Sequence, residues 1–166
     1  MKKCIELEAV ETVLGNENKL IDFQEQWDKI INKANVNYDE TSNYNSLTKE
    51  EKVWFNIQLL INAVNNGGMI SFFYNYEANH YLETIESLKE LKQEKVIELL
   101  EKIAIIFPEG IVPKDIDERN RIIESLSDEE DEKYDKMFEK IDNDFFEIEN
   151  KLESDLINYL KINNLV

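Results

Sequence analysis

The stretch Val64-Asn65-Asn66-Gly67-Gly68-Met69-Ile70-Ser71-Phe72-Phe73-Tyr74-Asn75 lies between two runs of apolar residues at helical spacing. Two of the four glycines in the chain stand side by side in it. Glycine adopts positive φ at little steric cost, so a Gly-Gly pair can end one helix and let the next begin at once. The stretch therefore predicts a rigid corner between two helices.

We interpret Asn65 and Asn66 as structural, because polar side chains beside paired glycines can bond the free backbone groups at helix ends. One alternative is that amides of the corner bind an anion or a peptide, although no Lys or Arg occurs between Lys52 and Lys89. Another is a small-molecule or catalytic pocket lined by Asn65, Asn66, Phe73 and His80. For His80 itself, which precedes a helical pattern, we expect a capping or surface role.

Apolar residues at steps of three and four continue on both sides of the corner. They predict helices over residues 20–34, 48–64, 70–76, 82–91, 96–107, 115–126 and 127–141, and a longest helix over 144–160. Thr48 with Glu51, and Ser127 with Glu130, match capping boxes, and Asp115 can cap its own helix. Residues 35–47 predict a loop, and residues 5–8 alternate as a short strand would. The fold class is all-α: an irregular bundle of about seven to nine helices, in one domain over residues 1–166.

The chain is strongly acidic: 36 Asp and Glu outweigh 19 Lys and Arg, for a net charge of −17. Such a chain repels nucleic acid and anionic membranes, so its partners should be basic. The single cysteine, Cys4, allows no internal disulfide and fits a reducing compartment. Because neither a secretory signal nor a long apolar run is present, we predict a cytoplasmic protein.

Enzyme motifs are absent from the sequence. We find no phosphate-binding glycine loop, no nucleophile elbow, and no His or Cys pair at metal-ligand spacing. We therefore expect a protein that is not an enzyme, with no catalytic residue, no metal and no cofactor.

Acidic residues concentrate near the end of the chain, where 14 occur from Glu124 to Asp155 against four lysines. Several recur three or four positions apart, which places them on successive turns of one helical face. Rows of carboxylates on neighbouring helices can approximate the phosphate rows of a DNA duplex. The alternative is a solvated face that only keeps the protein soluble.

The corner resembles the Val-Asn-Asn-Gly-Gly-Phe-x-Gln-Phe-Phe-x-Asn signature of a bacterial family of acidic DNA-mimic proteins, a former domain of unknown function. Met69 and Ser71 depart from the signature. The other landmarks follow in family order: Ile103 to Pro108, Pro113-Lys114-Asp115 with Arg119 and Arg121, Ile141 to Phe146, and Asp155 to Leu160. The resemblance covers residues 45–163, and we expect residues 1–44 to form a helical extension packed on that domain.

The resemblance implies a DNA mimic that covers the basic DNA-binding face of a transcription factor or nucleoid protein and blocks its DNA binding. An immunity or antitoxin-like protein that neutralises a basic toxin or nuclease through the same face is the alternative. Direct nucleic-acid or membrane binding is not expected, and the protein is a monomer or a dimer. The predicted partner-binding residues are Asp128, Glu129, Glu130, Asp131, Glu132, Asp135, Glu139, Asp142, Asp144, Glu147 and Glu149.

Overall fold

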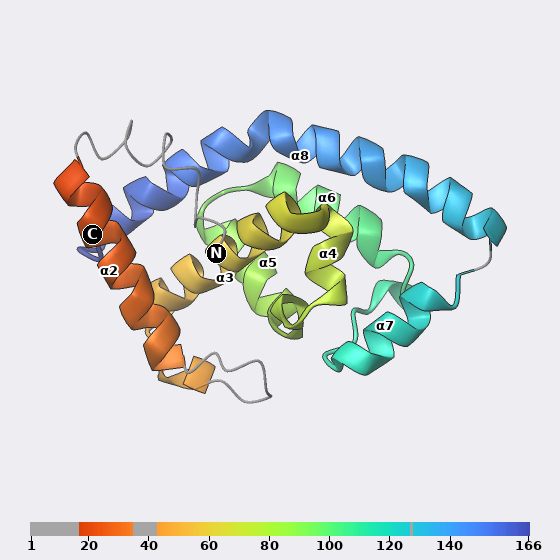
Figure 1. Ribbon diagram of the computed structural model, residues 1–166, viewed down its shortest axis with the longest axis horizontal. Coiled ribbons are helices and arrows are strands. Elements are labelled where there is room, and N and C mark those ends of the chain that lie inside the picture. Colours follow the sequence, from red (N-terminus) through yellow and green to blue (C-terminus); the bar gives the residue numbers. More distant parts are fainter. Residues whose placement is uncertain (1–16, 35–42, 127) are drawn as a thin grey trace.

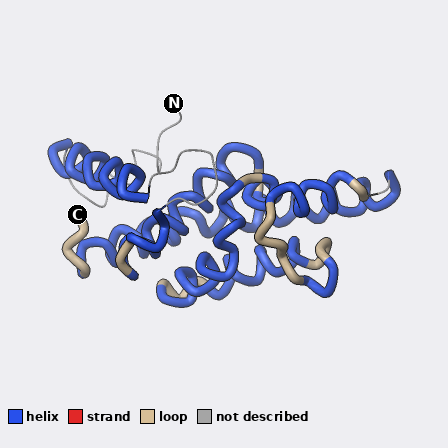
Figure 2. Tube along the Cα trace, turned by 90° about the horizontal axis from the view of Figure 1, so that it is seen from below, coloured by secondary structure: helices blue, strands red, loops and turns tan. Residues whose placement is uncertain are grey.

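The computed structural model describes residues 17–34, 43–126 and 128–166, with the backbone alone for residues 17–22 and 128–132. Helix α8 (Asp128–Ile162) runs along one long edge of an elongated molecule, and the other helices lie on one side of it (Figure 1). All regular secondary structure in these residues is helical (Figure 2). The all-α prediction is confirmed. The strand predicted at residues 5–8, the Ser127 cap and Cys4 lie outside the described residues.

Helix α3 (Lys49–Gly67) is the centre of the bundle. Its first turn is closed by the predicted capping box: the Glu51 amide donates to Thr48 Oγ1 at 3.2 Å, and the Thr48 amide donates to Glu51 Oε2 at 2.7 Å. Every residue from Val53 to Leu60 is buried. A helix that is buried all round must be covered on several sides, so α3 has more than the single inner face that its spacing predicted.

Helix α2 (Glu17–Ala34) covers α3 at one end of the molecule (Figure 1). Its buried stripe is Phe23, Trp27, Ile30 and Ala34, as the predicted period requires. The Phe23 and Trp54 rings lie 4.9 Å apart between centroids. The segment predicted as a loop contains a short 3₁₀ turn, η1 (Asn43–Ser46), in its described part.

Four further elements follow the corner: α4 (Met69–Tyr74), the 3₁₀ turn η2 (Tyr76–His80), α5 (Tyr81–Glu90) and α6 (Glu94–Ala104). Gly68 separates α3 from α4 with φ +77°, as the Gly-Gly pair predicted. Phe72 and Phe73 are fully buried. A third 3₁₀ turn, η3 (Pro108–Gly110), then leads to α7 (Ile116–Glu124), whose first turn is capped by Asp115 accepting from the Glu118 amide at 2.8 Å.

The structure corrects one prediction of helix number. Residues 127–141 and 144–160 were predicted as two helices, but α8 runs without interruption from Asp128 to Ile162. Its 35 residues contain no Gly or Pro, so no residue forces a break at Asn143 or Asp144. At a rise of 1.5 Å per residue, α8 is roughly 50 Å long.

Candidate partner-binding surface

The predicted acidic residues do not share one face of α8. Asp135, Glu139 and Glu147 are exposed, and Asp144 is half-buried. The side chains of Asp128 to Glu132 lie outside the described residues, although their backbone forms the first turns of α8. Residues 133–158 also expose four lysines, Lys133, Lys136, Lys140 and Lys151, against only three carboxylates. The outer side of this part of α8 therefore carries mixed charge.

Two of the predicted residues, Asp142 and Glu149, turn inward to the corner that follows α3. Asp142 Oδ1 accepts a hydrogen bond from the Met69 amide at 2.7 Å. Glu149 Oε1 accepts from Asn65 Nδ2 at 2.6 Å. Two carboxylates of α8 thus contact the corner itself, 73 and 84 residues away along the chain.

Three roles were considered for the corner, and its contacts bear on the structural role and on anion binding. Asn65 makes a structural contact, but with the Glu149 side chain of α8 rather than with the backbone groups at a helix end that were predicted. An amide of the corner also binds an anion, but that anion is the chain's own Asp142. Asn75 Nδ2 donates to the Ser71 carbonyl at 2.7 Å, while Asn66 is exposed.

Arg119, on α7, was not predicted as a buried residue, yet its side chain is 0% exposed. Its five N–H groups, which are all that a guanidinium has, each meet an acceptor. Nε donates to the Phe73 carbonyl, Nη1 to the Pro113 and Lys114 carbonyls, and Nη2 to the Asn75 carbonyl and Asn79 Oδ1, all at 2.7–2.9 Å. The cation lies where α4 ends, and a helix C-terminus favours positive charge. Arg119 therefore ties α7 to the segment from α4 to η2.

Glu77 lies near this cation in η2. Burial raises the pKa of its carboxyl from 4.5 to about 6, while Arg119 acts in the opposite direction. One of its oxygens, Oε2, is buried without a hydrogen-bond donor among the described residues. An ionised Glu77 is therefore poorly solvated in the folded protein.

We predict that Glu77→Gln removes a pH-dependent loss of stability. Between pH 4.5 and about 6 the unfolded chain ionises Glu77 while the folded protein keeps it protonated, so stability falls as pH rises through this window. Relative to the natural protein, the variant should gain on the order of 2 kcal/mol from pH 4.5 to pH 7. Urea unfolding at both pH values measures this difference. The exposed Glu98→Gln is the control, and parallel pH profiles for Glu77→Gln and the natural protein would contradict the prediction.

His80 stands at the N-cap position of α5, but its side chain does not cap the helix. Its ring is half-buried and stacks on Tyr44, with centroids 3.8 Å apart. It makes no side-chain bond to the start of α5, and burial lowers its pKa. In the described structure, Phe73 is fully buried and Asn65 bonds to Glu149, so these residues and His80 have separate neighbours. The contacts thus do not support a pocket shared by Asn65, Asn66, Phe73 and His80.

The acidic charge gathers at the α7 end of the molecule. Asp115, Asp117, Glu118 and Glu124 are exposed. α8 begins directly after α7, so its acidic first turns lie at the same end (Figure 1). Residues 115–135, which we call the acidic end, contain ten Asp or Glu and three Lys or Arg, one of them the buried Arg119. The carboxylates of α7 take part in none of the ion pairs found in the described residues.

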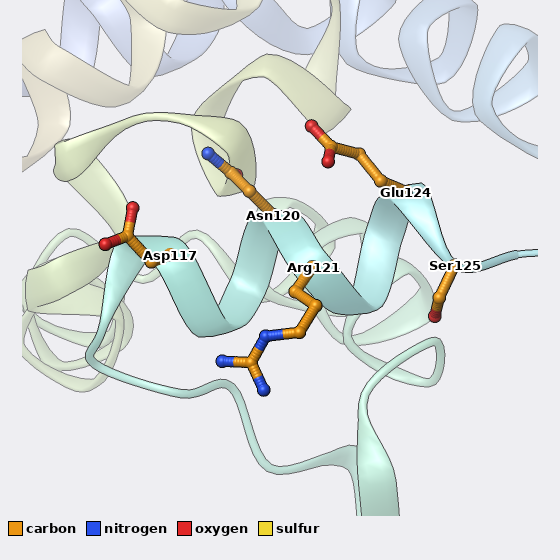
Figure 3. Close-up of a pocket in the computed structure, with 5 residues that line it drawn as sticks. All are labelled: Asp117, Asn120, Arg121, Glu124 and Ser125. Carbon is orange, nitrogen blue, oxygen red and sulfur yellow. The ribbon is translucent and has the colours of Figure 1, made fainter.

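A shallow, open depression of about 550 Å³ lies on α7 within the acidic end. Its lining residues are Asp117, Asn120, Arg121, Glu124 and Ser125. Figure 3 shows Asp117, Asn120 and Glu124 on one side of the helix and Arg121 on the other. Asn120 Oδ1 is buried and has no hydrogen-bond donor among the described residues. Arg121 is an exposed cation that partly offsets the negative charge here.

The sequence analysis included Glu124 in the acidic concentration but not the exposed Asp115, Asp117 and Glu118 at the start of α7. The exposed row Glu94, Glu98 and Glu101 on α6 was also missed. Their i, i+4 and i+7 spacing was the available signal. Within the described residues, no group of three or more His, Cys, Asp and Glu side chains is close enough to hold a metal ion. None of the described helices has the length and apolar character needed to span a bilayer.

Fold and composition define an acidic protein whose described residues form an all-helical bundle. A family model described as DMP19-like protein matches residues 45–163. The chain belongs to the DMP19-like protein family, and the match covers the same residues as the predicted resemblance. No curated protein matches the chain, and no solved structure does.

Proposed function

We propose that this protein is a DNA mimic without catalytic activity, which occupies the basic face of a DNA-binding protein and so prevents that protein from binding DNA. The observation that carries the proposal is the family match over residues 45–163. The net charge of −17 supports it, because a basic partner would gain the electrostatic attraction that it gains from DNA.

The acidic end is the surface that we assign to this role. It joins exposed carboxylates of α7 to the acidic first turns of α8. The middle of α8 suits the role less well, because its exposed lysines would repel a basic partner. Of the residues predicted from the sequence, Asp128 to Glu132 and Asp135 therefore remain in the proposed interface.

The first experiment is affinity capture from the source cell at low salt, followed by elution at high salt and competition with duplex DNA. We expect to capture a basic DNA-binding protein. Added duplex DNA should then displace it from the complex. Binding should weaken steeply as salt rises, since screening acts on exposed charges. Capture of a basic toxin or nuclease instead would overturn the proposal in favour of the antitoxin alternative.

We predict that the variant Glu118→Lys, Glu124→Lys, Glu129→Lys, Glu130→Lys weakens partner binding by roughly 100-fold or more, because each reversal replaces an attraction with a repulsion. Fluorescence anisotropy of the captured partner on labelled DNA, with the variant as competitor, measures this. All four residues belong to the acidic end, and the side chains of Glu118 and Glu124 are exposed.

Two matched controls test whether position matters as well as charge. Glu139→Lys with Glu147→Lys reverses exposed charges in the middle of α8 and should change affinity by less than about threefold. Arg121→Gln makes the acidic end more negative and should leave binding equal or tighter. If affinity falls by the same amount per reversed charge in the acidic-end variant and in the mid-α8 variant, the assigned surface is wrong.

A further inference from the structure

Asp142 is the point where α8 meets the start of α4. The amide of Met69, which opens α4, donates to Asp142 Oδ1 at 2.7 Å. Gly68, at the N-cap position, makes no side-chain bond to the helix, and the first amide of α4 is bonded by a residue of α8. The capping carboxylate also carries the charge that a helix N-terminus favours.

Gly68 leaves the space that this contact needs. A Cβ built on Gly68 would lie 2.3 Å from Asp142 Oδ2, far closer than atoms approach without bonding. Its φ of +77° is also one that residues with a side chain rarely adopt. The glycine of the corner and the aspartate of α8 therefore fit each other.

A second contact fixes the register of α8 on the same face. Glu149 lies seven residues, or two turns, after Asp142, and it accepts from Asn65 at 2.6 Å. Phe145, between the two carboxylates, is fully buried. The corner thus holds α8 by two polar contacts on either side of one core aromatic, which opposes both sliding and rotation of the helix.

On the N-terminal side of Asp142, α8 extends towards α7 and contains the acidic residues Asp128 to Glu132. Its main packing partners are α3, α4 and α6 (Figure 1). On the N-terminal side of Asp142, the described side chains that pack on the core are the buried Ile141 and the partly buried Tyr134, Met137 and Phe138. From Asp142 to Asp128 the helix extends roughly 21 Å, so a tilt of about 10° at Asp142 moves its start by roughly 4 Å. A displacement of this size is as large as the N···O distance of about 4 Å within which a salt bridge forms, so it would separate ion pairs between α8 and a partner.

We infer that Asp142 is a positioning residue, which the Asn65–Met69 corner holds so that α8 presents the acidic end in one fixed geometry. The partner then meets the carboxylates of α7 and α8 in a set arrangement, and Asp142 itself does not touch the partner. We call the Met69–Asp142 and Asn65–Glu149 contacts the clamp. The effect of the clamp on partner binding rests on the proposed function, but the clamp itself can be measured without a partner.

The first test measures the direction of α8 by electron–electron resonance between nitroxide labels at Arg121→Cys and Lys136→Cys, with Cys4→Ser and dilution by unlabelled protein. Arg119 ties α7 to the core, so the label on α7 is a fixed reference. Asp142→Asn keeps an oxygen that accepts from Met69, and its distance distribution should equal that of the natural protein. Asp142→Ala should broaden the distribution or shift it by roughly 1.5 Å, because the label at Lys136 lies six residues, or about 9 Å, from Asp142. An unchanged distribution in Asp142→Ala would overturn the clamp.

The second test measures affinity for the captured basic partner. Asp142→Ala should weaken binding roughly tenfold, whereas Asp142→Asn, which also removes the charge, should bind as the natural protein does. Glu139→Ala, which removes an exposed carboxylate of α8, is the matched control and should change affinity less than Asp142→Ala. If Asp142→Asn loses as much as Asp142→Ala, the charge itself contacts the partner and the inference is wrong.

The two tests separate failure of the clamp from failure of the proposed function. If no basic protein binds the natural protein, the proposed function fails, while the label distances still report on the clamp. If the partner binds but Asp142→Ala leaves both distances and affinity unchanged, the clamp fails and the proposed function stands. Circular dichroism of each variant confirms that its helix content is retained.

Discussion

Replacing Arg119 by Met is expected to destabilise the protein by about 3–5 kcal/mol, which is a large fraction of the stability of a domain. The guanidinium makes five hydrogen bonds in a fully buried position, four of them to backbone carbonyls. Methionine fills much of the volume but donates to none of these acceptors, and each buried acceptor left without a donor is unfavourable. Removing the buried charge recovers part of the loss, because burial lowers the pKa of Arg119 and thus disfavours its charged form.

The measurement is urea unfolding at pH 7, with Arg121→Met as the control on the same helix. Arg121 is exposed, so its replacement should change stability by less than about 0.5 kcal/mol. Arg119→Lys should fall between the two, since an ammonium has three donors in place of five. A loss below about 1 kcal/mol in Arg119→Met would show that the five bonds do not hold α7 in place.

Local chemistry explains which parts of the fold the sequence predicted well. The Thr48 capping box, the Asp115 cap and the Gly-Gly corner each depend on residues within four positions of one another, and all three are present. The apolar stripe of α2 also depends only on helical spacing. Such features need no knowledge of what packs against them.

The acidic face was predicted less well because charge alone does not show which way a side chain points. Asp142 and Glu149 occupy the same helical face as Phe145 and Leu152, at spacings of three, four and three. That spacing was visible in the sequence, but the predicted break before residue 144 placed Asp142 outside the final helix. A single continuous helix would have put both carboxylates on the buried side.

Arg119 illustrates the same limit. It stands three residues after Ile116 and four before Ile123, on the apolar stripe of α7. A charged residue on such a stripe is usually solvated, and only the tertiary structure brings five acceptors to it. The position of Arg119 on the apolar stripe was therefore a signal that it could be buried, but its hydrogen-bond partners were not predictable from the sequence.

Replacing Gly68 by Ala is the other change with a large expected effect, roughly 3 kcal/mol or more. Two terms add: strain from a side chain at φ +77°, about 1–2 kcal/mol, and displacement of Asp142 from the Met69 amide, about 1.5–3 kcal/mol. Gly67→Ala is the matched control, because its Cβ would meet only the Ser71 side chain, at 3.2 Å, and its φ is not in the left-handed region. It should change stability by less than about 1 kcal/mol.

A double-mutant cycle decides whether the two terms share a cause. If Gly68→Ala acts mainly by expelling the Asp142 carboxylate, then adding Asp142→Ala removes the clash and has little further effect. The combined loss should then fall short of the sum of the single losses by about 1 kcal/mol or more. Additive losses would mean that the strain at Gly68 alone accounts for its effect. In that case Gly68 would act on the turn between α3 and α4 alone, and the corner would hold α8 through the Met69–Asp142 and Asn65–Glu149 contacts independently of the strain at Gly68.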